Sequence, residues 1–280
     1  MTPNLVATSE DTAKRSAPQP QRRAALPPLL VRAAAAVAPW IALVVLWYLV
    51  RLSGLVKPSL VPTPADVLTK LWHLIVAQGL LFDAWESTMR VLAGLACGIV
   101  LAVPVGFVLG WYRGLGRFLD PLVNFFRALP PIALIPLVIV YFGIGEVAKI
   151  AILFYAAFFA GVIVMYEGIR QTSPLYVRVA RTLGATDSEI FLRVIVPLSL
   201  PHVLTALRVA LGVTWATLVA AELVAAQRGL GAVIQNASNY FQISTIYAGI
   251  VCIGAIALLM DATVRAASAR LVSWQERVTR

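Results

Sequence analysis

The feature that most constrains this chain is a series of long apolar segments separated by short polar stretches. A helix needs about 20 mostly apolar residues to cross a hydrocarbon core of about 30 Å. Six segments come close to this length, at residues 33–50, 91–111, 122–142, 148–165, 203–226 and 246–264. Only 13% of the residues are charged and the mean hydropathy is +0.85, whereas a soluble domain is about a quarter charged. The sequence therefore predicts an all-α membrane protein with about six transmembrane helices.

The third apolar segment is the least regular of the six. Arg127 and three prolines, Pro130, Pro131 and Pro136, interrupt residues 122–142. A span tolerates proline where its neighbours satisfy the carbonyl groups that the proline frees, so we expect this segment to be buried inside the helix bundle. A further apolar run at residues 71–81 is too short to cross, and we expect a surface helix there on the extracytoplasmic side.

Charged residues indicate how the spans are oriented. With both termini in the cytoplasm, 15 of the 23 Lys and Arg residues fall on the cytoplasmic side and 6 on the other side. The net charge of +10 is also compatible with nucleic-acid binding, but an excess of basic residues in cytoplasmic loops explains it without such a partner. We therefore expect cytoplasmic termini, and no nucleic acid as a partner.

Composition divides the chain into one membrane domain and two polar ends. Residues 1–32 combine prolines with basic residues, which is typical of a disordered leader. The apolar segment that follows is too long, and lies too far into the chain, for a cleaved signal peptide. We expect a disordered basic cytoplasmic leader at 1–32, a membrane domain at 33–274 with a cytoplasmic loop at 167–201, and a cytoplasmic tail at 275–280.

The loop before the fifth span carries the clearest helix boundaries of the chain. Ser173 suits the N-cap of a helix and Pro174 suits its first turn. Gly184 suits the left-handed residue that ends a helix. Thr186 then begins a second helix, and Glu189 three residues later completes a capping box. The sequence therefore predicts two short helices that meet at a glycine turn.

The second short helix is expected to end at Pro197. The apolar residues of the two helices can form a knob that a partner protein grips, and these are Leu175, Val179, Leu183, Ile190, Phe191 and Val194. The alternative is an amphipathic loop that lies on the membrane surface.

Signals of enzyme chemistry are weak. The two histidines, His73 and His202, fall on opposite sides of the membrane in this topology, so they cannot share a metal. No Gly-rich phosphate-binding loop is present, which argues against ATP hydrolysis by this chain. Cys97 and Cys252 lie in apolar runs without metal-like spacing and are interpreted as packing residues rather than as a disulfide or a ligand pair. We expect no cofactor, no metal and no catalytic residues.

Charged residues inside the predicted spans point to a pathway or to structural ion pairs, because a charge at membrane depth is costly. Arg208 and Glu222 lie in the fifth span, and Asp261 lies late in the sixth. Arg208 and Asp261 both fall near the cytoplasmic ends of their spans, which allows them to pair. For Arg208 and for Glu222, a structural role and a place on a substrate path both stay open. Arg127 is a further candidate for an anion path.

The two intramembrane charges of the fifth span belong to a stripe with helical spacing. Its members recur at steps of three and four, which places them on one helix face that we expect to point inward: Thr205, Arg208, Gly212, Trp215, Val219 and Glu222. Trp215 is either a packing residue or part of the path. The glycine-rich turns at Gly143 to Gly145 and at Arg228 to Gly231 are interpreted as tight helix-ending turns.

The cytoplasmic loop resembles the "EAA" loop of ABC importer permeases. That pattern has Glu-Ala-Ala, three residues, Gly, nine residues, and an apolar motif that ends in Pro. Gly184 and Pro197 stand at the family spacing, and Ala180 matches the second Ala. Arg178 stands where the family has Glu, and Val179 where it has the first Ala. This departure is common in the branch that resembles permeases for taurine, aliphatic sulfonates, nitrate and related small anions.

Further blocks extend the resemblance from about Pro39 to Trp274. They are Leu129-Pro-Pro-Ile-Ala-Leu-Ile-Pro-Leu137, Tyr141 to Glu146, Leu207 to Trp215, and Leu218 to Gly231, the last of which is most similar to taurine permeases. The resemblance implies the type I importer (MetI-like) fold. It implies a homodimer in the bacterial inner membrane, two partner subunits that bind ATP and Mg, and a periplasmic or lipid-anchored solute-binding protein.

The resemblance also assigns site residues. The residues expected to couple this chain to the ATPase are Arg178, Ala180, Leu183, Gly184, Ala185, Ile190, Phe191 and Pro197. Candidates for the translocation path are Arg127, Arg208, Trp215 and Glu222. Two rivals of other classes stay open: a secondary transporter driven by an ion gradient, and an intramembrane enzyme.

Overall fold

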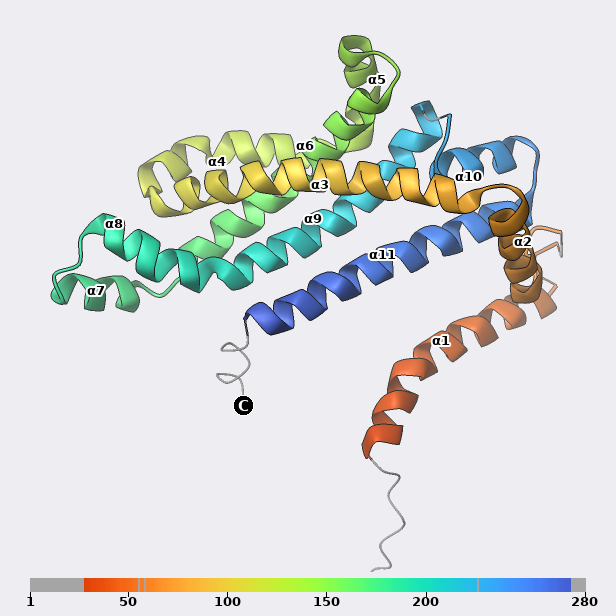
Figure 1. Cartoon of the computed structure of the whole chain (residues 1–280), viewed down its shortest axis with the longest axis horizontal. Coiled ribbons are helices and arrows are strands. Elements are labelled where there is room, and N and C mark those ends of the chain that lie inside the picture. The colour runs from red at the N-terminus through yellow and green to blue at the C-terminus, as the bar shows by residue number, and fades with distance from the viewer. Residues whose placement is uncertain (1–27, 55, 58, 226, 273–280) are drawn as a thin grey trace, which may run out of the picture. The chain divides into compact units, whose positions relative to one another are not determined.

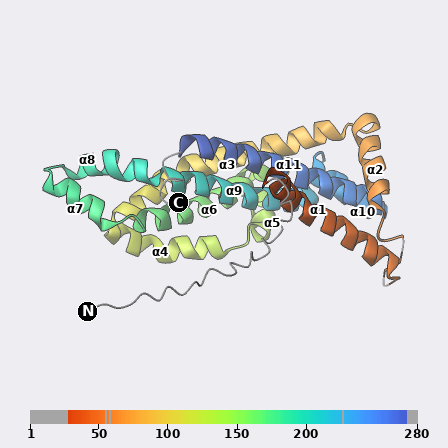
Figure 2. The same ribbon diagram turned by 90° about the horizontal axis from the view of Figure 1, so that it is seen from below.

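Every regular element in the described part of the chain is a helix, in the computed structural model shown in Figures 1 and 2. The structure describes residues 28–54, 56–57, 59–225 and 227–272, with residues 28–36 and 225 described by their backbone alone. Most of the predicted leader and all of the predicted tail lie outside the described residues. The chain divides into two compact units, Met1–Leu55 and Val56–Arg280.

The first unit contains α1 (Pro28–Leu52). The second unit contains all other helices, which are α2 (Pro64–Ala77), α3 (Leu80–Trp111), α4 (Arg113–Ala128), α5 (Pro131–Phe142), α6 (Glu146–Arg170), α7 (Pro174–Thr182), α8 (Asp187–Ile190), the π-helical segment η1 (Phe191–Ile195), α9 (Val196–Ala225), α10 (Leu230–Asn239) and α11 (Ile243–Leu271).

Four helical stretches among the described residues are long and apolar enough to cross a membrane. They are Leu80–Trp111, Glu146–Arg170, Asp187–Val224 and Ile243–Leu271, and the bent pair of α4 and α5 makes a fifth if it counts as one span. The predicted spans at 91–111, 148–165 and 246–264 lie inside these stretches, and that at 203–226 coincides with the end of the third. In α1 the stretch with described side chains, Val37–Leu52, is shorter than a span, so the first span stays a prediction.

A stripe of small residues brings α3 and α6 into close contact. The stripe has a small residue at every fourth position of α3, namely Gly94, Gly98, Ala102, Gly106 and Gly110. A Cβ atom added at Gly98 would lie 2.5 Å from the Cβ of Ala157, so only glycine fits there. Small residues at this spacing let two helix backbones approach closely in a membrane. The α3–α6 pair is therefore the most extensive contact between spanning helices in the described part of the chain, and α9 packs against both members of the pair.

The third predicted span is wrong as a continuous helix. The chain forms α4 and α5 instead, which are bent by 89° at the break between them. Leu129 and Pro130, which separate the two helices, both adopt extended backbone. The residue before a proline is disfavoured in the helical region, and two successive prolines impose this twice. The expected burial is also wrong, because in α4 and α5 only Gly116 and Ile135 are buried among the described residues.

The helix that begins after Thr186 does not end at Pro197, contrary to expectation. It runs without a break through α8, η1 and α9 as the stretch Asp187–Val224. The backbone N–H of Val196 bonds to the carbonyl of Phe191, a π-helical bond over five residues. The next residue, Pro197, has no backbone N–H and so donates no hydrogen bond within the helix. We attribute the tolerance of this proline to the wider π-turn that immediately precedes it.

The short helix expected at 71–81 is present with other bounds: it is α2, which begins at Pro64 and ends at Ala77, whereas Leu80 and Leu81 already belong to α3. Thr63 caps α2 in a capping box with Asp66, and Gly79 turns the chain into α3 with a positive φ of 70°. In Figure 1, α2 and α10 lie at one end of the second unit, whereas α7 and α8 lie at the other. The two ends have different chemistry, as described below.

The close α3–α6 contact predicts the effect of a larger side chain. Gly98→Val places two methyl groups where a single Cβ already clashes with α6, so we expect a loss of about 1–3 kcal/mol in stability. Thermal unfolding of the purified protein in detergent measures this loss. Gly254→Val is the matched control, because a Cβ at Gly254 meets nothing within 4 Å. Equal unfolding temperatures for the two variants would contradict the role of the stripe.

Candidate functional site

The first candidate site is the turn that joins α7 to α8. Gly184 has a φ of +83°, the left-handed conformation that favours glycine. Its N–H donates to the carbonyl of Arg181 at 3.0 Å, and the N–H of Ala185 donates to the carbonyl of Ala180 at 3.1 Å. These two bonds form a Schellman motif. At the other end of α7, Ser173 caps the helix through its Oγ, which accepts from the backbone N of Leu175. The predicted boundaries of α7 are confirmed.

The start of α8 is held as tightly as the end of α7. Thr186 and Glu189 form the predicted capping box, with the backbone N of Thr186 donating to Glu189 at 3.0 Å. Across the turn, Arg181 Nη2 donates to Asp187 Oδ1 at 2.9 Å. The turn therefore has a defined shape, which a partner protein can recognise.

The predicted apolar knob is half right. Leu175, Val179 and Leu183 are all exposed, and no residue of α7 is buried. Ile190, by contrast, is fully buried, and the ring of Phe191 packs edge-on against an aromatic ring of α3. The expected place of Ile190 and Phe191 on the exposed knob is therefore wrong, because their helix turns this face toward α3.

The small residues of the turn connect it to the core. Ala180, Ala185 and Phe191 are partly buried against a cluster that contains Ile190 and Ile195. Ala180 therefore lies on the side of α7 that packs against the core, whereas Leu183 is exposed. The other two predicted coupling residues are exposed: Pro197 lies in the first turn of α9, and Arg178 borders a cleft of about 790 Å³.

A second candidate site is a buried ionic cluster at the opposite end of the unit, centred on Arg90 of α3. The side chain of Arg90 is 5% exposed. All five of its N–H groups are used: Nε and Nη2 bond to Glu146 at 2.6 and 2.8 Å, Nη2 bonds to Glu86 at 2.7 Å, and Nη1 bonds to Glu222 at 2.7 Å and to the carbonyl of Arg228 at 2.9 Å. This is the full donor capacity of a guanidinium group.

Glu222, at the C-terminal end of α9, is the most buried acid of the cluster, with 1% exposure. Besides Arg90, it accepts bonds from Ser87 Oγ at 2.8 Å and from the backbone N of Gly231 at 2.8 Å. A Cβ at Gly229 would lie 2.5 Å from its Oε1. The Arg228 to Gly231 turn therefore does more than end a helix: its glycines make room for a buried carboxylate.

The sequence analysis missed this cluster except for Glu222. Lys149 completes it, with its Nζ 2.6 Å from Glu146 Oε1. The available signal was the pair of glycine-rich turns, since the second turn cradles Glu222 and the first immediately precedes Glu146. Of the two interpretations of Glu222, the structural ion pair is the one that its burial and its contacts support.

The predicted pair of Arg208 and Asp261 is confirmed. Arg208 Nε lies 3.0 Å from Asp261 Oδ1, and Arg265 Nε lies 3.1 Å from Asp261 Oδ2. One carboxylate therefore serves two guanidinium groups, and the three side chains together keep a formal charge of +1. Arg208 is partly exposed, so it remains accessible to an anion.

Arg127 lies at the break between α4 and α5. It is exposed and makes no ion pair with any residue that the structure describes. The neighbouring ring of Phe126 stacks on Phe159 of α6 at 5.7 Å between centroids. Phe159 is 13 residues into α6, or about 20 Å along a helix that is about 37 Å long. The break therefore lies near the middle of a spanning helix, where an unpaired charge is costly.

The expectation that the stripe of α9 points inward is only partly right. Trp215 and Glu222 are buried, whereas Thr205, Arg208 and Gly212 are exposed. Steps of three and four repeat every 3.5 residues, so such a stripe drifts around a straight helix of 3.6 residues per turn. Trp215 packs in an apolar cluster, which agrees with the packing interpretation, although its Nε1 has no hydrogen-bond partner among the described residues.

The ionic cluster predicts a large effect for the loss of its central cation. Arg90→Gln leaves Glu222 buried without a counter-charge, and we expect a loss of about 3–5 kcal/mol in stability. Arg90→Lys should not restore it, because lysine offers three donors instead of five. Thermal unfolding in detergent measures both variants. Arg270→Gln is the control, since that side chain is exposed and lies outside the cluster; an Arg90→Gln protein as stable as this control would contradict the role of the cluster.

Comparisons with known proteins agree with this architecture. Residues 94–273 match the family model of the binding-protein-dependent transport system inner membrane component. The fold also resembles a solved structure of the MetNI methionine ABC transporter in an inward-facing conformation. The TM-score is 0.59 at 22% identity, over 69% of this chain and 96% of that chain. This likeness supports the expected MetI-like permease fold.

Curated relatives are more similar in sequence. A probable ABC transporter permease of Brucella abortus is 46% identical over 82% of this chain and 91% of its own length. The taurine transport system permease protein TauC of Escherichia coli is 36% identical over 84% of this chain and 88% of its own length. The Brucella protein, whose name states no substrate, is more similar to this chain than TauC is, so the expected similarity to taurine permeases is confirmed at the level of the branch.

Other relatives carry other names. A putative aliphatic sulfonates permease of Bacillus subtilis is 30% identical and a bicarbonate permease of Synechococcus elongatus is 33% identical, over 83% and 71% of this chain. These matches cover the same branch as TauC and leave its substrates open. The chain therefore belongs to the binding-protein-dependent transport system inner membrane components, as a multi-pass ABC importer permease of the taurine, sulfonate and bicarbonate branch that is not itself the ATPase.

Proposed function

We propose that this permease carries taurine or a related small sulfonate across the bacterial inner membrane, driven by ATP hydrolysis in a partner subunit. The observation that carries the proposal is the exposed, well-capped α7 at one end of the spanning bundle, on a chain whose sequence has no phosphate-binding loop. Its similarity to TauC supports the substrate class. The excess of basic residues on the same side supports a cytoplasmic location for α7 and for both termini.

The assembly that we propose has two copies of this chain, two ATP-binding subunits with ATP and Mg, and a solute-binding protein at the outer face. Leu175 and Val179 of α7 form an exposed apolar row at steps of four with Leu183, the C-cap residue of this helix. Such a row is the usual contact of a helix that docks in a groove. Arg178 projects from the same helix and takes the place of the family's Glu, so the ATPase should offer an acidic group there.

The path from the ATPase contact into the membrane is short. Asp187–Val224 is one continuous helix of 38 residues, which is about 57 Å long, whereas the hydrocarbon core is about 30 Å thick. The α8 end of this helix therefore extends beyond the hydrocarbon. A displacement of the turn at Gly184 is transmitted directly to a spanning helix, because no flexible connection separates α8 from α9.

The anion path that we propose uses Arg127 and Arg208. Arg127 supplies a guanidinium group near mid-depth that has no ion-pair partner among the described residues, and Arg208 supplies a partly exposed one in an arginine-rich cluster. A sulfonate accepts charge-assisted hydrogen bonds from a guanidinium group, often two at once. Glu222 and Trp215, which were also candidates, are buried in packed surroundings and have no part in this path.

Two alternatives remain of practical interest. Alkanesulfonates, nitrate and bicarbonate are other small anions that suit the same path. The relatives named for sulfonates and for bicarbonate support two of these three alternative substrates. A secondary transporter is the alternative of another class. Such a protein would transport in liposomes without any ATPase, whereas we expect this chain to be inert alone.

Reconstitution tests the class and the coupling site together. With its ATPase and binding protein in liposomes, we expect ATP-dependent uptake of labelled taurine. Gly184→Pro should reduce uptake to background while the protein still reaches the membrane, because proline cannot adopt a φ of +83° and removes the N–H that bonds to Arg181. Gly184→Asn is the matched control and should keep most of the uptake, since asparagine tolerates the left-handed conformation. Normal uptake by the Gly184→Pro protein would overturn the coupling role.

The anion path generates a separate prediction. Arg127→Gln removes a charge without removing a structural contact, so we expect normal assembly and ATPase activity with uptake reduced about tenfold, equivalent to about 1.4 kcal/mol. Arg127→Lys should retain part of the uptake. Competition by alkanesulfonate, nitrate and bicarbonate in the same assay ranks the substrates. Unchanged taurine uptake by the Arg127→Gln protein would exclude Arg127 from the path.

A further inference from the structure

The cleft beside α7 is rich in arginine. It has a volume of about 790 Å³ and lies between the corner of α3 and α4, the end of α6, and the α7–α8 turn. Five arginines line it together with a single acid, Asp187; the arginines are Arg113, Arg117, Arg170, Arg178 and Arg181. The lining therefore has a formal charge of +4.

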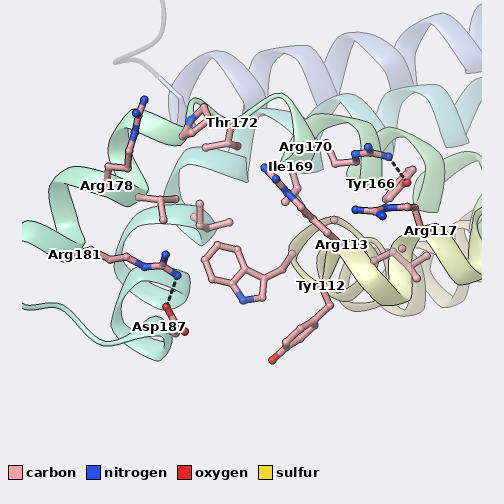
Figure 3. A pocket seen from close by; sticks show the side chains of 17 residues that line it. Tyr112, Arg113, Arg117, Tyr166, Ile169, Arg170, Thr172, Arg178, Arg181 and Asp187 are labelled. Atoms are coloured by element: carbon pink, nitrogen blue, oxygen red, sulfur yellow. Dashed lines mark hydrogen bonds and ion pairs between the residues drawn. The ribbon is translucent and has the colours of Figure 1, made fainter.

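Two of the arginines are already engaged and two are available to a ligand. Arg181 pairs with Asp187, and Arg170 donates to the hydroxyl of Tyr166. Arg113 and Arg117, one turn apart at the start of α4, make no ion pair with any described residue. Figure 3 shows both reaching from α4 into the middle of the cleft, whereas Arg178 points away at its α7 side. The cleft is thus organised to hold an anion between α4 and α6.

The cleft lies where two spanning helices end, and we therefore expect it at the membrane surface. Its walls include the last residues of two spanning helices, Trp111 of α3 and Arg170 of α6. Trp and Tyr are enriched where a span meets the headgroup region, and here Trp111 is followed by the exposed Tyr112. The anion that the cleft accepts is therefore one that is available at headgroup depth.

A second hollow adjoins the cleft and has the opposite character. Trp111, Tyr112 and Asp187 line both, and the second hollow, of about 340 Å³, is completed by Val108, Ser188, Phe191 and Leu192. Val108 lies one turn deeper along α3 than Tyr112, and Leu192 lies deeper along the other helix than Ser188. Both of these apolar side chains are exposed. An apolar groove thus leads from the arginine cleft toward the hydrocarbon.

We propose that the cleft and the groove together bind one anionic phospholipid. The phosphate of the headgroup lies against Arg113 and Arg117, and an acyl chain follows the groove past Trp111. A soluble anion would use the cleft alone and leave the groove empty. An acidic segment of the ATPase would match the cleft but not an apolar groove that runs toward the membrane interior. Basic pockets between spanning helices are known to bind anionic headgroups.

Native mass spectrometry of the delipidated full chain tests the proposal. We expect phosphatidylglycerol to bind about tenfold more tightly than phosphatidylcholine. The double variant Arg113→Gln/Arg117→Gln should lose this preference. The double variant Arg193→Gln/Arg270→Gln has the same loss of charge at exposed positions that line neither hollow, and it should keep the preference. A preference that persists in the cleft variant, or that is absent in the unmodified protein, overturns the proposal.

A second measurement keeps all the arginines of the cleft in place. Phosphatidylglycerol with brominated acyl chains should quench Trp111 fluorescence, seen as quenching that is lost in Trp111→Phe, and brominated phosphatidylcholine should quench it less. Two further arms separate the sources of the anion. If glycerol phosphate alone displaces the lipid, or if added ATPase subunit abolishes the quenching, the cleft belongs to a soluble anion or to the ATPase, and the lipid site is excluded.

Discussion

The guanidinium group of Arg90 is the interaction on which one end of this permease depends. It joins α3 to the first turn of α6, to the end of α9 and to the turn before α10 through four hydrogen bonds, and a fifth bond goes to Glu86 of α3 itself. A buried charge costs several kcal/mol unless its partners are complete, and here they are. Any movement that separates these helices at this end breaks several charge-assisted bonds at once. The cluster therefore holds the three helices in a fixed relation.

The other end of the unit has the opposite organisation. Its arginines are exposed and only partly paired, and no residue of α7 is fully buried. Between the two ends, the small-residue stripe of α3 holds α6 in close contact along the length of the pair. The ionic cluster fixes one end of the bundle, and the stripe fixes the α3–α6 pair along its length. A force applied at α7 therefore moves mainly the parts of the bundle that neither of them holds. The long helix that begins at Asp187, which carries α8 and α9 together, is the element placed to move.

Local features of the structure were predictable from the sequence because they depend on a few adjacent residues. The caps at Ser173 and Thr186 and the turn at Gly184 form within single helical turns, and all three are confirmed. The pairing of Arg208 with Asp261 was also predictable, because topology alone brings those two helix ends together. The small-residue stripe of α3 is a further local pattern, since its spacing of four is visible in the sequence alone.

Features that depend on distant segments were not predictable in the same way. The partners of Arg90 are up to 138 residues away in the chain, and no local pattern identifies them. Ile190 has the same apolar character as Leu183, and only the packing of its helix against α3 decides that one is buried and the other exposed. Pro130 and Pro131 indicated an irregular helix, but a sequence with these prolines is compatible both with a buried kink and with the exposed bend of 89° that the structure has.

Paired and unpaired charged side chains have different roles in this permease. Charges that are fully paired, such as Arg90 and Glu222, add rigidity and have no capacity left for a ligand. Arg127, Arg113 and Arg117 make no ion pair with any residue that the structure describes, so they keep their capacity, and for Arg127 near mid-depth this has the cost of an unfavourable environment. A membrane protein retains such a cost where an anion offsets it. The unpaired arginines are therefore where transported or bound anions are to be sought.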